Sequence, residues 1–367
     1  MELRTLKNLH IKNKKILVRC DFNVPLGSDN KVNKSEDYKI RQTLPTIKYL
    51  LKNNCSIILI SHLGRPEGRR VKRFSLLPVR DRLEKLLKRK VKFSNDCIGL
   101  KTSKIISELK PKEIILLENL RFHPEEEHGS QSFAKKLASY ADFFVQDAFG
   151  VCHRDHSSVT FIPRYLRSAA GLLVEKEVKV LEKVMKKPKK PAIAIIGGIK
   201  IETKLPVIDN LKDKFDHILL SSAISYEFLK ENKIKLEKGK EDLQDRVPKN
   251  YSNIILPVDY RWDKGRVFDT GKKSIKLFKD YIKRAKTIVW NGPLGMYEDK
   301  RFRDGTFKIA KAISKSKAFK VVGGGETVNT LLDTKTFDKM NHVSTGGGAM
   351  LEFLSGKKLL GVEVLKI

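Results

Sequence analysis

The sequence is poor in cysteine and has no long hydrophobic run. Its four cysteines, Cys20, Cys55, Cys97 and Cys152, stand far apart without a CxxC pair. A chain of 367 residues needs no disulfide staples, so we expect reduced thiols, as in a cytosol. The first residues lack the apolar core of a signal peptide, and no apolar run is long enough to span a bilayer. The sequence therefore predicts a cytoplasmic protein that does not enter a membrane.

Two widespread nucleotide-binding signatures are also missing. No GxxxxGK[ST] pattern occurs, which argues against a P-loop, and neither Gly323–Gly325 nor Gly346–Gly348 completes GxGxxG. His153–Asp155 has the letters of a protein-kinase catalytic loop, but Thr160 stands where that loop needs asparagine, and no DFG follows. His153 and His156 have no carboxylate or cysteine at ligand spacing, which favours a hydrogen-bonding role over a zinc site.

Acidic residues are scarce beside basic ones. The 75 Lys and Arg residues against 43 Asp and Glu give a net charge of +32, which attracts polyanions such as nucleic acid. The lysines are spread along the whole chain, with local clusters only at Arg69–Arg73 and Lys186–Lys190, and no basic and aromatic stripe of a nucleic-acid module occurs. We interpret most of the charge as surface composition and expect no specific nucleic-acid partner.

Short apolar runs alternate with amphipathic stretches along the chain. Solid runs of Ile, Val and Leu suit strands buried on both faces of a parallel sheet. The stretches between them have apolar residues at helical spacings of three and four. This alternation predicts an α/β fold with two Rossmann-like, doubly wound parallel-sheet domains. The expected strands are Ile16–Cys20, Ser56–Ile60, Glu113–Leu117, Phe143–Gln146, Ala192–Ile196, His217–Leu220, Asn253–Pro257, Thr287–Trp290 and Lys320–Val322, and the clearest helices are Leu76–Leu87, Phe133–Tyr140, Val174–Lys187 and Phe302–Ser314.

A charged segment with two prolines, Lys186–Pro191, marks the expected domain boundary. It ends the Val174–Lys187 helix and precedes a new strand. With 40% hydrophobic residues, the chain can bury two cores of ordinary size. We expect an N-terminal domain over residues 1–173, an interdomain helix and hinge over 174–191, a second domain over 192–355 and a C-terminal tail over 356–367 that packs on the first domain.

The residues that follow the expected strands differ between the two halves. Ligands of open α/β sheets bind outside the carboxyl ends of the strands. In the first half these ends carry His62, Arg65 and Arg121, and guanidinium groups suit phosphate and carboxylate. In the second half they are rich in glycine, which lets backbone N–H groups approach a phosphate. The sequence therefore predicts a site for a small anion in one half and a nucleotide site in the other.

Lys200 and Lys204 follow a glycine pair in the second half. Their spacing of four predicts that both lie on one face of the first turns of a helix. There the two ammonium groups would converge on one phosphate. A solvated helix face is the alternative interpretation.

Taken together and in order, these segments resemble the phosphoglycerate kinase family across nearly the whole chain. The resemblance implies a hinged pair of domains that transfers a phosphoryl group reversibly, with Mg²⁺, between 1,3-bisphosphoglycerate and ADP, giving 3-phosphoglycerate and ATP. It also implies a monomer. The segments that carry it are Val18–Pro25, Leu44–Ile47, Ser61–Pro66, Glu118–His123, Asp147–Gly150, Trp290–Pro293, Gly323–Gly325 and Ser344–Ala349.

The resemblance also assigns residues to ligands. Lys39, Lys200 and Lys204 would act on the transferring phosphoryl group, and Glu326 would bind magnesium. Alignment and electrostatic stabilisation suffice for this chemistry, so no covalent protein intermediate is needed. The glycerate substrate would contact Asp21, Asn23, Lys39, His62, Leu63, Gly64, Arg65, Arg121 and Arg154. The nucleotide would contact Gly198, Lys204, Asn291, Pro293, Glu298, Gly324, Gly325, Glu326 and Thr327, with Gly324 to Thr327 at a helix N-terminus.

Three positions depart from the family pattern. Lys39 replaces an arginine that stabilises the transferring group, and lysine lacks the planar fork. Glu326 replaces the aspartate expected to bind magnesium, and reaches one methylene further. Ser221–Ala223 replaces a glycine run beside adenine, which leaves the choice between ADP and GDP open. The alternative hypotheses are a phosphotransferase of the same fold with another nucleotide preference and an RNA-binding protein on a kinase scaffold.

Overall fold

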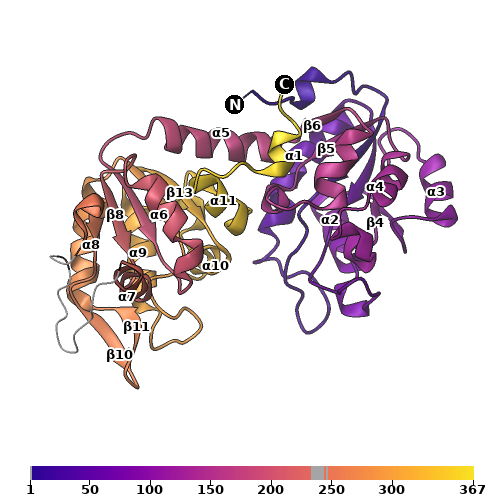
Figure 1. The fold of residues 1–367 in the computed structure, drawn as a ribbon. Helices are drawn as coiled ribbons and strands as arrows, with labels where there is room; N and C mark the ends of the chain where they lie inside the picture. The colour runs from indigo at the N-terminus through magenta and orange to yellow at the C-terminus, as the bar shows by residue number, and fades with distance from the viewer. Residues whose placement is uncertain (1, 233–243, 245–246) are drawn as a thin grey trace. The chain divides into compact units, whose positions relative to one another are not determined.

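The structure is a computed structural model that describes residues 2–232, 244 and 247–367 (Figure 1). The chain divides into two compact units. The first comprises Met1–Lys179 together with Lys358–Ile367, and the second comprises Val180–Lys357. Each unit has a six-stranded sheet of its own in which every neighbouring pair of strands is parallel, so the expected α/β fold with two parallel-sheet units is confirmed.

The sheet of the first unit has the strand order β3-β4-β2-β1-β5-β6. Its central strand β1 pairs with β2 on one side and β5 on the other, and Leu17 stands opposite both Ile58 and Phe144. The strands are β1 (Lys15–Arg19), β2 (Ser56–Ile60), β3 (Lys92–Ser94), β4 (Ile114–Leu117), β5 (Phe143–Gln146) and β6 (Ser168–Ala170).

Helices cover both faces of this sheet, which explains the solid apolar runs. Successive side chains of a strand point to opposite faces. Ile16 and Val18 therefore pack in one core, and Leu17 packs in the other with Phe133 and Leu137. The helices are α1 (Tyr38–Lys52), α2 (Leu77–Leu87), α3 (Leu100–Ser107), α4 (Gln131–Ala138) and α12 (Leu360–Glu363), with short turns at Leu6–Asn8, Lys72–Phe74, Leu120–Phe122, Pro124–Glu126, Phe149–Val151, Ser157–Phe161 and Ile162–Arg164.

The sheet of the second unit has the order β14-β13-β12-β7-β8-β9. A separate antiparallel hairpin joins β10 to β11 through Lys264 and Gly265, which both have positive φ. The strands are β7 (Ala192–Ile196), β8 (His217–Leu220), β9 (Ile254–Ile255), β10 (Tyr260–Asp263), β11 (Arg266–Thr270), β12 (Thr287–Asn291), β13 (Phe319–Gly323) and β14 (His342–Val343).

Amphipathic helices build the core of the second unit. Phe278 of α8 and Ile309 of α9 pack with the fully buried Trp290 of β12. The helices are α5 (Leu172–Lys186), which begins in the first unit, α6 (Leu205–Leu211), α7 (Ser222–Glu231), α8 (Lys272–Arg284), α9 (Asp304–Lys315), α10 (Gly325–Asp333) and α11 (Gly347–Leu354), with short turns at Ile201–Thr203, Lys249–Tyr251 and Phe337–Lys339.

Every expected strand is present, although the ends of several strands differ from the prediction by one or two residues. Strands β3, β6 and β14 and the hairpin of β10 and β11 were not predicted from the sequence. The three missed sheet strands are short and lie at the edges of their sheets, and they contain polar residues such as Lys92, Ser168 and His342. A strand of two or three residues has no periodicity that a pattern can detect.

The C-terminal segment is part of the first unit. Gly361 N–H donates to Cys152 O at 2.8 Å, and Arg4 N–H donates to Leu365 O at the same distance. A Cβ at Gly361 would lie 2.7 Å from Val159, so the close approach depends on glycine. All four cysteines are free and buried. Among the described residues, no helix combines the length and apolar character that a membrane span requires.

Candidate active site

The carboxyl ends of β1, β2 and β4 lead into a basic pocket in the first unit. The pocket has a volume of about 690 Å³. It brings together six of the residues expected to bind glycerate or to lie beside that site, which are Asn23, His62, Gly64, Arg65, Arg121 and Arg154. The residues predicted to form a small-anion site therefore line a cavity, and three of them are arginines.

Arg121 is the buried cation of this pocket, while Arg65 and Arg154 are exposed. The Arg121 side chain donates to Gly64 O at 2.8 Å and lies 3.2 Å from the Glu127 carboxylate. Gly64 N–H in turn donates to Asn23 Oδ1 at 3.0 Å. These contacts fix one guanidinium, and the two exposed arginines keep their forks available for an anion.

His62 and His156 line the same pocket as neutral rings. Burial and then the positive charge of Arg19 lower the pKa of His62 well below its usual value, and burial and Arg121 lower the pKa of His156 to about 3. Arg19 Nη2 lies 3.3 Å from His62 Nδ1. Arginine can only donate, so Nδ1 is the acceptor and the ring proton of His62 resides on Nε2.

Behind the pocket, Arg19 is fully buried in a polar network. Its Nε donates to Ser158 Oγ at 2.8 Å, and a guanidinium nitrogen lies 3.9 Å from Glu126. Ser158 Oγ also donates to Glu126 at 2.6 Å. The pairing compensates the buried charge and holds the side chains that orient His62.

Three predicted glycerate residues do not line the basic pocket. Asp21 and Lys39 form an ion pair of their own, with Lys39 Nζ 2.9 Å from Asp21 Oδ2. Leu63 lines a neighbouring cavity of about 520 Å³, and its backbone is held by Asn119. Sequence reasoning, for its part, did not assign Glu127, Gly150, Val151, His153 or His156, which do line the basic pocket.

A second cavity, of about 720 Å³, lies at the carboxyl ends of β7, β12 and β13 in the second unit. Its lining contains all the residues expected to contact the nucleotide and also Lys200. These are Gly198, Lys200, Lys204, Asn291, Pro293, Glu298, Gly324, Gly325, Glu326 and Thr327.

Glycine is required where two strand ends meet beside this cavity. Gly197 N–H donates to Asn291 O at 2.8 Å, and Gly198 N–H donates to Pro293 O at 2.9 Å. A Cβ at Gly197 would clash with the backbone oxygens of Gly292 and Pro293. The glycine pair therefore allows the two loops to join and to form one wall of the cavity.

The helix N-terminus expected beside the nucleotide is present. Helix α10 begins at Gly325, and Gly324 precedes it with a φ of +100°. Thr327 accepts a hydrogen bond from Gly292 N–H at 2.9 Å, which ties the helix start to the end of β12. The unpaired N–H groups of a first helical turn favour anions.

Lys200 and Lys204 do not lie on one helix face, so that expectation was wrong. Pro206 favours the first turn of a helix, and α6 accordingly begins at Leu205, after a short 3-10 turn at Ile201–Thr203. Both lysines nevertheless line the cavity, Lys200 as an exposed side chain and Lys204 as a buried one.

Lys204 and Asn291 form the buried polar end of this cavity. Lys204 Nζ donates to Asn291 Oδ1 at 3.2 Å. Burial lowers the pKa of Lys204 to about 8, and the carboxylate of Glu326 opposes that shift. Asn291 Nδ2 is buried and has no hydrogen-bond partner among the described residues. Both groups can therefore donate to an anionic ligand.

Glu326 and Glu298 place two carboxyl groups close together on the same cavity. Burial and then the neighbouring Glu298 raise the pKa of Glu326, whereas Lys204 acts in the opposite direction. Adjacent carboxylates repel each other unless a proton or a cation lies between them. Oxygen ligands of this kind suit Mg²⁺.

The Ser221–Ala223 departure has a small effect on the wall of the cavity. Ser221 and Ser222 are fully buried, and Ser222 Oγ lies 2.9 Å from Thr270 Oγ1. Of the three residues, only Ala223 lines the cavity. The departure therefore adds one methyl group to the wall, while the serine hydroxyl that is hydrogen-bonded to Thr270 does not line it.

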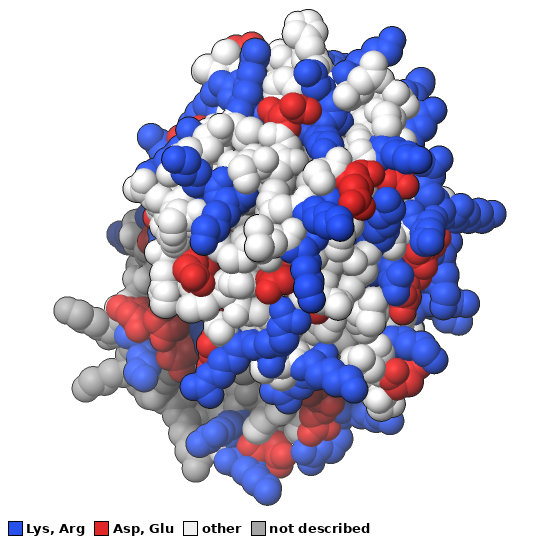
Figure 2. All heavy atoms as spheres, turned by 90° about the vertical axis from the view of Figure 1, so that its right-hand side faces the viewer, with Lys and Arg blue, Asp and Glu red and all other residues white. Residues whose placement is uncertain are grey.

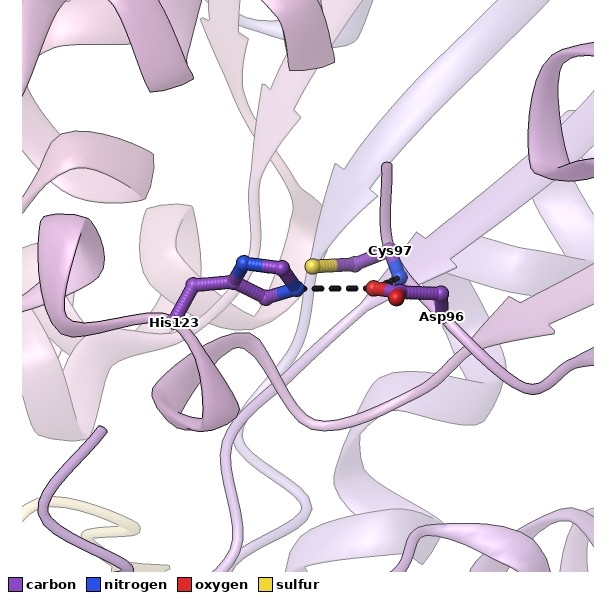
Figure 3. A group of neighbouring side chains, drawn as sticks. All are labelled: Asp96, Cys97 and His123. Carbon is purple, nitrogen blue, oxygen red and sulfur yellow. Dashed lines mark hydrogen bonds and ion pairs between the residues drawn. The ribbon is translucent and has the colours of Figure 1, made fainter. Parts of the chain in front are cut away.

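A cluster of metal-ligand types lies outside both pockets. Figure 3 shows His123 and Cys97 beside the Asp96 carboxylate. Asp96 Oδ1 accepts from Cys97 N–H at 2.7 Å and lies 2.7 Å from His123 Nε2, while Arg70 lies 3.3 Å from Oδ2. Burial raises the pKa of the Cys97 thiol, which keeps it protonated. Since the carboxylate already accepts protein donors, we interpret the cluster as a structural contact.

The fold and its two pockets define a class of protein, a nucleotide-dependent phosphotransferase without a P-loop. The anion pocket and the glycine-rich pocket each lie at the carboxyl edge of a parallel sheet, where ligands of such folds bind.

Comparison with known proteins narrows this class. The sequence profile of the family described as phosphoglycerate kinase matches residues 6–357. The chain belongs to the phosphoglycerate kinase family. Its reaction is therefore the reversible transfer of a phosphoryl group between 1,3-bisphosphoglycerate and ADP, and neither alternative raised by the sequence gains support from the comparisons.

Relatives of known name agree over the full length. The phosphoglycerate kinase of Koribacter versatilis is 42% identical over 100% of this chain and 99% of its own. That of Finegoldia magna is 40% identical with the same coverage. Among solved structures, the phosphoglycerate kinase of Coxiella burnetii has a TM-score of 0.82 at 33% identity, and that of Pyrococcus horikoshii has 0.85 at 27%, each over 99% of this chain and 98% of the other.

Proposed function

We propose that the basic pocket of the first unit binds the glycerate substrate and that the glycine-rich cavity of the second unit binds ADP or ATP. The observation that carries the proposal is the separation of ligand chemistry between the two units. Three arginines line the first pocket, whereas the second combines a helix N-terminus with two lysines. The first set suits a small anion with phosphate and carboxylate groups, and the second suits a phosphate chain.

In the first pocket, Arg65 and Arg154 would bind the phosphate and carboxylate groups of the glycerate substrate, because their guanidinium groups are exposed. Arg121 and the neutral His62 would donate from fixed positions, with the His62 proton on Nε2. Asn23 would orient the substrate from the loop after β1. Lys39, held by Asp21, would stabilise the transferring phosphoryl group.

In the second cavity, Lys200 and Lys204 would contact the nucleotide phosphates and the transferring group. Asn291 Nδ2, which has no partner among the described residues, would donate a hydrogen bond to a ligand oxygen. The N–H groups at Gly324 to Thr327 would face the phosphates at the start of α10. The remaining contacts, with Gly198, Pro293 and Glu298, would hold the rest of the nucleotide.

Magnesium fits the carboxylates of this cavity. Glu298 raises the pKa of Glu326, so two carboxylate oxygen donors lie near each other, and Mg²⁺ prefers donors of this type. Glu326 would hold the ion, and Glu298 would stand beside it. When bound, the ion would neutralise negative charge on the nucleotide phosphates.

The two pockets belong to different units, so we propose that the units close on each other during transfer. We place the hinge for this motion at residues 174–191, where α5 ends and the proline-containing segment follows. Closure would also exclude water from the reactive acyl phosphate. For the working enzyme we propose a monomer in the cytoplasm.

Initial rates with 3-phosphoglycerate and ATP test the assignment of the pockets. Arg154→Gln should raise KM for 3-phosphoglycerate by about tenfold and leave KM for ATP nearly unchanged. Lys200→Gln should raise KM for ATP by about tenfold and leave KM for 3-phosphoglycerate nearly unchanged. A variant that raises both constants equally would contradict the separate assignment. Measuring kcat/KM for ADP and GDP decides the nucleotide, and the small change at Ala223 leads us to expect ADP.

A further inference from the structure

The second unit has another pocket at the opposite edge of its sheet. It is lined by residues just before β12, β13 and β14, including Lys286, Ala318 and Asn341, whereas the nucleotide cavity follows the carboxyl ends of these parallel strands. Its volume is about 370 Å³. The pocket is therefore separate from the site described above.

Five lysines line this pocket, and its lining contains no acidic residue. They are Lys183, Lys187, Lys189, Lys286 and Lys317, and all five are exposed. They come from three distant parts of the chain, the end of α5 with the segment after it and the turns before β12 and β13. Side chains such as Val184, Ala318 and Phe319 provide an apolar floor.

The five ammonium groups are not neutralised by the protein. None of them forms an ion pair with any residue in the described part of the chain. The nearby Glu182 and Asp216 already pair with other lysines, Lys186 at 2.9 Å and Lys190 at 3.2 Å. Like charges that converge without counter-charges raise the local positive potential.

Backbone contacts hold several of these lysines in place. Lys286 N–H donates to Pro191 O at 2.8 Å, and Lys286 O accepts from Phe319 N–H at 2.9 Å. Thr287 Oγ1 donates to Lys189 O at 2.8 Å. Lys183 Nζ lies 4.4 Å from the centre of the Phe319 ring. The repulsion between the lysines therefore cannot be relieved by moving the main chain apart.

The surroundings distinguish this pocket from the general charge of the molecule. On the face drawn in Figure 2, Lys and Arg side chains are spread widely, with Asp and Glu groups between them. In the pocket the lysines converge without such groups.

We propose that this five-lysine pocket binds an oligophosphate anion. Ammonium groups act as compact point charges that suit phosphate oxygens without a fixed geometry. A chain of linked phosphates could contact more of the five lysines at once than a single phosphate could. Binding would relieve the repulsion between the lysines, and its strength should fall as salt increases.

Calorimetric titration with tripolyphosphate tests the proposal, with saturating 3-phosphoglycerate and ADP present to occupy the basic pocket and the nucleotide cavity. The Lys286→Gln/Lys317→Gln double variant should bind at least about tenfold more weakly than the wild type. The matched control is Lys135→Gln/Lys136→Gln, which removes the same charge from exposed positions on α4. It should bind within about twofold of the wild type, because neither residue lines the five-lysine pocket.

Turnover with 3-phosphoglycerate and ATP should be unchanged in both double variants, since the altered lysines are exposed and lie outside the catalytic pockets. Thermal unfolding should show that neither variant is less stable than the wild type. Equal loss of binding in the two variants would reduce the effect to net charge and overturn the proposal. Unchanged binding in the Lys286→Gln/Lys317→Gln variant would also overturn it. A Lys286→Gln/Lys317→Gln variant that binds single-stranded RNA more weakly but tripolyphosphate as the wild type does would likewise overturn the proposal.

Discussion

Lys39 Nζ lies 2.9 Å from Asp21 Oδ2, so a buried carboxylate fixes the cation that we expect in place of a family arginine. The ion pair holds the ammonium near the end of β1, where the residues of the basic pocket begin. Because the ammonium is already in position, it can stabilise a transition state without any rearrangement of the site. A point charge nevertheless lacks the two parallel donors of a guanidinium.

We predict that Lys39→Ala lowers kcat by at least about tenfold, because it removes a positive charge that acts on the transferring group. Lys39→Arg is the matched control, and it should keep or exceed the activity of the wild type. Steady-state rates with 3-phosphoglycerate and ATP measure both. An unchanged kcat in Lys39→Ala would remove this residue from the mechanism.

We predict that Glu326→Gln raises the Mg²⁺ concentration needed for half-maximal rate by about tenfold, since a neutral amide is a weaker ligand for a hard cation. Glu298→Gln serves as the comparison and should have a smaller effect. The measurement is a magnesium titration of the rate at saturating substrates. If both variants show the metal dependence of the wild type, the ion is held elsewhere.

The lowered pKa of Lys204 predicts a pH dependence of nucleotide use. The side chain is charged below its pKa of about 8 and loses its proton as the pH rises through that value. We expect kcat/KM for ATP to fall by about tenfold per pH unit above pH 8. Arginine stays protonated over this range, so Lys204→Arg should lack the decline, even if its maximum is lower. If the wild type and Lys204→Arg have the same pH profile, another group causes the decline.

Asp147 predicts a pH dependence of stability. It is fully buried, accepts from Leu173 N–H at 3.0 Å, and burial raises its pKa from 3.8 to about 8. Because the folded pKa lies above the unfolded one, this stabilising contribution is complete below about pH 4 and is lost as the pH rises to about 8.

Asp147→Asn keeps an acceptor for Leu173 N–H and cannot ionise. Relative to the wild type, its free energy of unfolding should therefore increase by up to about 1.4 kcal/mol per pH unit between pH 5 and 7.5. Urea unfolding followed by circular dichroism at both pH values measures the difference. A difference that does not change with pH would show that Asp147 is ionised in the folded protein.

The sequence predicted most of the fold because both sheets are built from solid apolar strands. Ser56–Ile60 and Ala192–Ile196 were predicted with their observed ends. The two pockets were predictable for a related reason, since parallel strands bring the residues after them to one edge. His62 and Arg65 follow β2 and Arg121 follows β4, yet all three line one pocket.

Other features depend on contacts that no local pattern contains. The helix expected at Lys200 begins later because Pro206 sets its first turn. Glu127 and His156 reach the basic pocket from irregular turns, where periodicity gives no signal. The five-lysine pocket joins residues more than a hundred positions apart, such as Lys183 and Lys317, and only the folded chain shows that they converge.

Turnover in a coupled assay with 1,3-bisphosphoglycerate and ADP tests the central claim most directly. The wild type should form ATP with saturation by both substrates, and Lys204→Ala should retain its fold while losing most of the rate at low ADP. A folded wild-type protein that forms no ATP above the uncatalysed background would contradict the account.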